Sequence, residues 1–68
     1  MARMTLTADE STYNDSVRFA LIAQHNTAAL ALSRDLGCAR VIVVVVDPSI
    51  DEERRSNVLD SWTVEAVR

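Results

Sequence analysis

The clearest pattern in the chain is a run of six branched aliphatic residues, Val41 to Val46, with no polar residue among them. Such a run has no alternation of period two, which is typical of a strand covered on both faces in a parallel or mixed sheet. The stiff χ1 angles of valine and isoleucine favour strand over helix. We therefore expect a buried strand over residues 40–46, bracketed by the charges of Arg40 and Asp47.

The segment before this strand is rich in alanine and leucine, and it predicts a long helix from about 15 to 36. Gly37, the only glycine, fits the C′ position that follows a helix and favours a positive φ. A helix that is apolar on most sides is expected to be buried in an assembly. The apolar residues of this helix fall on two separate stripes, one with Val17, Leu21, Ala28 and Leu32, the other with Phe19, Ala23 and Leu30.

The same segment has a second interpretation, in which residues 17–23 form a strand instead. Gln24 and His25 would then make a turn, and Asn26 would cap a short helix over 27–36. With 41–46 as the next parallel strand, the chain would have the order β-α-β-α-β. Ala20 and Ala23 favour the helix, whereas Phe19 and Ile22 favour the strand, so both interpretations stay open.

The two flanking segments carry weaker patterns. Met4 and Leu6 alternate with threonines, which predicts a short strand over 3–7, and residues 1–13 could also be a flexible or exchanged arm. After Asp47, the sequence Pro48-Ser-Ile-Asp-Glu52 stops the strand and resembles a capping box, which predicts a second helix over about 50–60. Residues 62–67 fit either a continuation of that helix or a further strand.

These elements define a small single domain, residues 1–68, of the α/β or α+β class. A chain of this length buries only about 60% of its unfolded surface and usually needs a disulfide, a metal or a partner. Cys38 is the only cysteine and His25 the only histidine, so neither a disulfide nor a metal site is expected. We therefore expect a homo-oligomer or the subunit of a larger complex.

The charge balance excludes several classes of function. Ten acidic residues against seven arginines, with no lysine, give a net charge of −3 and no basic patch for phosphates, so we expect no nucleic-acid partner. No apolar run approaches the length of a membrane span or a signal peptide, so we expect a cytoplasmic protein without membrane contact. No motif indicates a cofactor.

Few residues are candidates for chemistry. Asp47 follows the buried strand, where ligands of open α/β sheets bind, and Ser49 lies beside it as a candidate ligand-binding residue. His25 is a second candidate catalytic group. Cys38, next to the glycine, is expected to be a small apolar residue rather than a nucleophile. The candidate interface residues are the large apolar ones, Trp62, Val58, Leu59 and Phe19.

The layout has one family resemblance. The order of a polar start, a helix, and Leu36-Gly37 leading into an aliphatic strand resembles the small tautomerase superfamily over residues 15–46, which implies an oligomer of short chains. The catalytic amino-terminal proline of that family has no counterpart, because the chain begins Met1-Ala2-Arg3 and its only proline is Pro48. Residues 19–26 are also similar to the first strand and loop of methylglyoxal synthase, although the rest of such an enzyme exceeds this length.

Three functions follow as hypotheses. The first is a non-enzymatic assembly or interaction protein that acts as a homo-oligomer or complex subunit and presents an acidic, arginine-bearing helix over 50–60. The second is a small oligomeric enzyme, tautomerase-like in layout only, with a site near Asp47 at a subunit boundary. The third is an acidic, antitoxin-like regulator of a basic protein.

Overall fold

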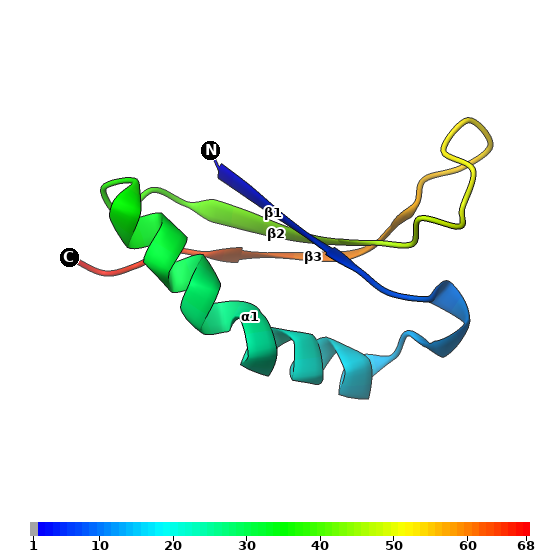
Figure 1. Cartoon of the computed structure of the whole chain (residues 1–68), viewed down its shortest axis with the longest axis horizontal. Coiled ribbons are helices and arrows are strands. Elements are labelled where there is room, and N and C mark those ends of the chain that lie inside the picture. The colour runs from blue at the N-terminus through cyan, green and yellow to red at the C-terminus, as the bar shows by residue number, and fades with distance from the viewer. Residues whose placement is uncertain (1) are drawn as a thin grey trace.

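The computed structural model describes residues 2–68 as one helix packed on a three-stranded sheet (Figure 1). The elements are strand β1 (Ala2–Thr7), the short 3-10 helix η1 (Glu10–Thr12), helix α1 (Asp15–Asp35), strand β2 (Val41–Val46) and strand β3 (Val58–Val64). The protein is therefore a small α+β domain. The mixed sheet, the long helix and the strand over 41–46 confirm the corresponding predictions.

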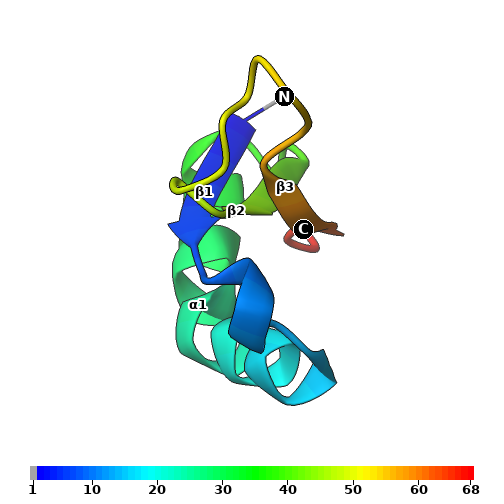
Figure 2. The same ribbon diagram turned by 90° about the vertical axis from the view of Figure 1, so that its right-hand side faces the viewer.

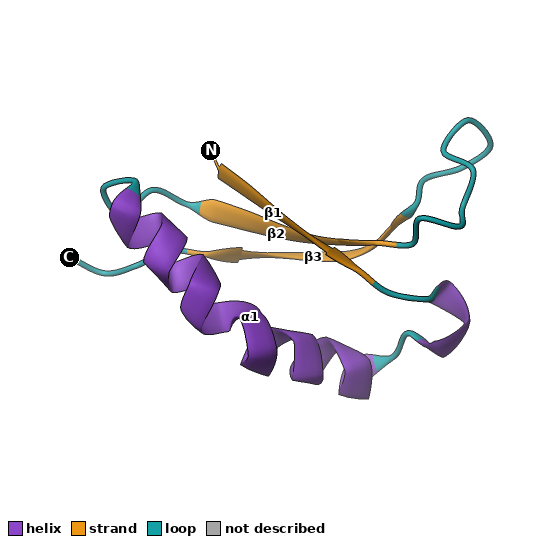
Figure 3. Ribbon diagram, in the orientation of Figure 1, coloured by secondary structure: helices purple, strands orange, loops and turns teal. Residues whose placement is uncertain are grey.

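β2 is the central strand of the sheet, which has the order β1-β2-β3 (Figure 3). β1 runs parallel to β2 from the pair Ala2–Val41 to the pair Thr7–Val46. β3 runs antiparallel to β2, with Val64 opposite Val41 and a bulge between Val45 and Val46. The first strand of the chain thus lies at one edge, and the last at the other.

α1 begins and ends where its sequence signals predict. The side chain of Asn14 caps the first turn by accepting from the N–H of Val17 at 3.0 Å. At the other end Gly37 has φ +72° and its N–H donates to the carbonyl of Arg34, while the N–H of Cys38 donates to that of Ser33 at 2.8 Å. This is a Schellman turn, and it confirms Gly37 at C′. The alternative strand over 17–23 is wrong, because these residues lie inside α1.

The core lies between α1 and one face of the sheet. Val41, Val43 and Val45 point from β2 into it and are 0–1% exposed, and Ala29 of α1 is fully buried. Ser33 is also fully buried, where its hydroxyl donates to the carbonyl of Ala39 at 2.7 Å and accepts the N–H of Ala66 at 2.8 Å. These two hydrogen bonds fix the C-terminal segment against the end of α1.

The opposite face of the sheet has no element over it within residues 2–68 (Figure 1). Ile42, Val44 and Val46 alternate with the core residues and point toward this open face. Within one chain, α1 therefore covers only one face of β2. Of the three β2 residues on the open face, Val44 is nearly inaccessible, at 6% exposure, while Ile42 and Val46 are half-buried.

The predicted second helix over 50–60 is also wrong. Residues 47–57 form turns in which the carbonyl of Asp51 accepts the N–H groups of Arg54 and Arg55, and β3 begins at Val58. The free edge of β2 needs a hydrogen-bonding partner, and this long-range pairing outweighs the local capping signal. The strand alternative for 62–67 is correct as far as Val64, with Ala66 buried just beyond it.

Candidate functional site

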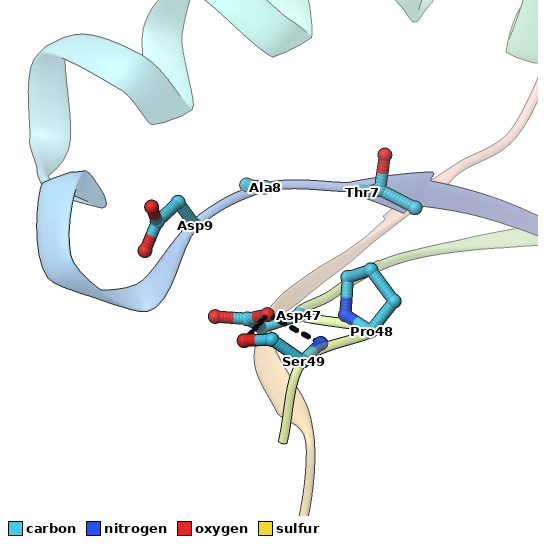
Figure 4. A pocket seen from close by; sticks show the side chains of 6 residues that line it. All are labelled: Thr7, Ala8, Asp9, Asp47, Pro48 and Ser49. Carbon is cyan, nitrogen blue, oxygen red and sulfur yellow. Dashed lines mark hydrogen bonds between the residues drawn. The ribbon is translucent and has the colours of Figure 1, made fainter.

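Asp47 lies directly after β2, where the chain turns out of the sheet, and is only 4% exposed. Its two carboxylate oxygens accept three hydrogen bonds. Oδ2 accepts the N–H of Glu10 at 2.8 Å, and Oδ1 accepts the N–H and the hydroxyl of Ser49 at 2.8 and 2.6 Å (Figure 4). The hydroxyl of Ser49, the N–H of Glu10 and the N–H of Ser49 together hold the pKa of Asp47 below its usual range.

An exposed ion pair closes the same region from outside. The guanidinium of Arg55 donates to both carboxylate oxygens of Glu10, at 2.9 and 2.7 Å, and so joins the 47–57 loop to η1. These hydrogen bonds lower the pKa of Glu10. Because Glu10 also donates its N–H to Asp47, one residue of η1 is held both by the end of β2 and by the loop after it.

A shallow, open hollow of about 290 Å³ lies beside Asp47. Its lining comes from the ends of the two parallel strands: Thr7, the last residue of β1, with Ala8 and Asp9 after it, and Asp47, Pro48 and Ser49 after β2 (Figure 4). Asp47 and Ser49 thus lie together beside the hollow, but their polar atoms bond to each other. A carboxylate with a lowered pKa, both of whose oxygens already accept hydrogen bonds, is a weak general base. These contacts favour a structural role for Asp47.

His25 lies in the middle of α1, half-buried, and no hydrogen bond or ion pair joins it to Asp47 in the described chain. The two candidate catalytic residues therefore sit on separate elements. Cys38 is half-buried with a free thiol and φ +64°, in the turn after α1. Across residues 2–68 no three His, Cys, Asp or Glu side chains are grouped closely enough to hold a metal ion.

The structure also contains a polar cluster that the sequence did not indicate. Asp60 of β3 accepts a 2.8 Å hydrogen bond from the Tyr13 hydroxyl and forms a 2.8 Å ion pair with Arg18. The Arg18 guanidinium lies 5.5 Å from the centroid of the Trp62 ring, a cation–π distance. Burial, followed by the bond to Asp60, raises the pKa of Tyr13 to about 12. The segment holding Asp60 was predicted to be helical, so its partners could not be inferred.

The four candidate interface residues lie in different environments. Trp62 packs against the core, half-buried, and Leu59 is half-buried on β3. Phe19 on α1 and Val58 at the start of β3 are 64% and 46% exposed. No described helix is both long and apolar enough to cross a membrane.

Comparison with known proteins gave no match to this chain, whether to family models, curated proteins or solved structures. The resemblance to small tautomerases therefore rests on the order of the elements alone.

Proposed function

We propose that this chain is a non-enzymatic assembly protein whose working form is a homo-oligomer. One observation carries the proposal. α1 contains no charged residue between Arg18 and Arg34, yet only Ala29 and Ser33 of its 21 residues are buried within one chain. A helix without a charged side is expected to be covered all round. The sheet supports the same conclusion, since its open face presents Ile42, Val44 and Val46. Their neighbours on that face are Arg3, Thr5 and Thr7 of β1 and Val58, Ser61 and Thr63 of β3.

The area that one chain leaves uncovered favours a second copy as the partner. The Cα extents of the chain are 40 × 26 × 12 Å, and its strands lie side by side along the shortest of them, so the molecule is only three strands wide in that direction (Figures 1 and 2). Among residues 2–68, only seven apolar residues are buried. A chain with so small a core is expected to be marginally stable alone. A second copy carries the same incompletely covered apolar residues, so association covers both chains by one set of contacts.

Size-exclusion chromatography with light scattering tests the proposal. The chain has a mass of 7.5 kDa, and we expect a particle of twice that mass or a higher multiple at micromolar concentration. A folded particle of 7.5 kDa at that concentration would overturn the proposal.

A pair of exposed apolar residues provides a matched comparison. Phe19→Ser should weaken association about tenfold or more, because an aromatic side chain at an interface contributes more than most residues around it. Val67→Ser changes a residue that is 91% exposed in the C-terminal segment, and it should leave the particle mass unchanged. Equal effects of the two substitutions would show that α1 has no special part in association.

A further inference from the structure

β1 is an open edge of the sheet, and the direction of its backbone groups follows from two hydrogen bonds. The N–H groups of Ala2 and Ala8 both donate toward β2, to the carbonyls of Arg40 and Val46 at 3.4 and 2.9 Å. Backbone groups alternate in direction along a strand, so those of the odd-numbered residues point the other way. The N–H and C=O groups of Arg3, Thr5 and Thr7 therefore point out of the sheet with no strand beside them (Figure 2).

The two edges of the sheet differ in how well they are protected against pairing. β3 carries a bulge opposite Val45 and Val46 and the charged Asp60, which points toward the helix side and is held by Tyr13 and Arg18. Bulges and inward-pointing charges are devices that block edge pairing. β1 has neither a proline nor a bulge, pairs with β2 in unbroken register and has a single charge, Arg3, near its start. β1 is thus the edge that accepts another strand.

On this basis we propose that two copies of the chain pair through β1, antiparallel about a two-fold axis at Thr5, into a continuous six-stranded sheet. This inference rests on the self-assembly proposed above and names one contact in it, which joins the two sheets edge to edge and leaves their open faces free for further association. The two-fold register sets Thr5 opposite Thr5 of the second copy and Arg3 opposite Thr7. All three outward-pointing residues then exchange both backbone hydrogen bonds, and no like charges face each other.

The same register also extends the core. Met4 and Leu6 lie on the helix side of β1, packed against the core cluster but only partly buried. In the two-fold pair Met4 lies opposite Leu6 of the second copy, so each covers the other. The side of the molecule that would be joined is the broad one, because the strands are arranged along the shortest axis (Figures 1 and 2).

Cysteine cross-linking at the two edges tests the proposal with a built-in control. Thr5 and Ser61 are matched positions, since each lies directly opposite Val44 on its own side of β2 and each side chain is exposed. In a Cys38→Ser background, Thr5→Cys should form a disulfide-linked dimer under mild oxidation, because Cα atoms about 5.5 Å apart lie within disulfide range. Ser61→Cys in the same background should give at least tenfold less disulfide-linked dimer. Equal cross-linking of the two, or more at Ser61→Cys, would overturn the proposal.

A second variant tests the same edge without a cysteine. Thr5→Pro removes one outward N–H and none of the bonds between β1 and β2, so the variant should fold and show a smaller particle mass. Thr5→Val, which keeps the N–H, should retain the mass. If the unaltered protein is oligomeric but Thr5→Pro leaves its mass unchanged and Thr5→Cys does not cross-link, the β1 contact is wrong and self-assembly stands. If the unaltered protein is a monomer, both proposals fail.

Discussion

Asp47 accepts a 2.8 Å hydrogen bond from the N–H of Glu10 and so ties the end of β2 to the turn after β1. The two strands are parallel, so their C-terminal ends lie at the same edge, and the chain segments that leave them must be held together there. With two further bonds from Ser49, both oxygens of the carboxylate accept hydrogen bonds, so its replacement has a defined effect.

Asp47→Asn should destabilise the protein, because the amide presents a donor where a carboxylate oxygen now accepts the N–H of Glu10 or Ser49. We expect Tm to fall by about 5 °C or more, the shift that follows the loss of roughly one hydrogen bond in a domain of this size. Ser49→Ala, which removes only one of the three donors, should lower Tm by less than Asp47→Asn does. A Tm unchanged in Asp47→Asn would contradict the structural role of the carboxylate.

The same carboxylate predicts that the folding stability decreases at low pH. The pKa of Asp47 is lowered in the folded protein, first by the Ser49 hydroxyl and then by two backbone N–H groups, and that of Glu10 is lowered by Arg55. Carboxyls with a lowered folded pKa contribute stability that is complete above the unfolded pKa of about 4 and is lost as pH falls through the folded pKa. Urea midpoints should therefore fall below about pH 4, and less steeply in Asp47→Asn. Parallel pH profiles for the two proteins would exclude this cause.

Tyr13 predicts that the folding stability also decreases at high pH. Its pKa is raised to about 12 by burial and by the bond to Asp60, so its contribution to stability is complete below the unfolded pKa of about 10 and is lost as pH rises toward 12. Tyr13 is the only tyrosine, so phenolate absorbance reports it directly. In Asp60→Asn the pKa of Tyr13 should fall but stay above 10, because burial remains. An unshifted titration in that variant would show that the bond to Asp60 has no effect.

The packing of α1 on the sheet predicts different outcomes for two alanines of one helix. Ala29 is fully buried against Val43 and Val64, so Ala29→Leu should lower the free energy of unfolding by about 1–3 kcal/mol through overpacking. Ala31 is exposed, and Ala31→Leu should change the free energy of unfolding by no more than ~0.5 kcal/mol. Urea unfolding of both variants provides the comparison. Similar losses at the two positions would mean that α1 does not present Ala29 to the core.

The sequence predicted those elements whose signals are local. A run of branched aliphatic residues specifies β2, and a glycine after an alanine- and leucine-rich segment specifies the end of α1. The helix over 50–60 was predicted from an equally local signal, the capping box at Ser49. It failed because Val58 to Val64 gains more by pairing with β2, a contact between distant segments that no short pattern reveals.

The candidate site shows the same limit. Asp47 and Ser49 are close in sequence, and their proximity could be predicted. The N–H of Glu10 is 37 residues away from Asp47, and Tyr13 is 47 residues from Asp60, so both contacts depend on how β1 and β3 align with β2. The open edge of β1, likewise, could be recognised only from the strand order.

Amide hydrogen exchange tests the central claim most directly, because it reports self-association and its location together. The outward N–H groups of Thr5 and Thr7 lie on the edge proposed to pair, and that of Thr63 lies on the outer edge of β3. Thr63 is the reference rather than Ser61, because the N–H of Ser61 donates to Oδ1 of Asp60 at 2.8 Å. In a concentrated sample of the unaltered protein we predict slow exchange at Thr5 and Thr7, faster exchange at Thr63, and loss of the difference on dilution. Exchange at Thr5 that is as fast as at Thr63 at every concentration would contradict the account.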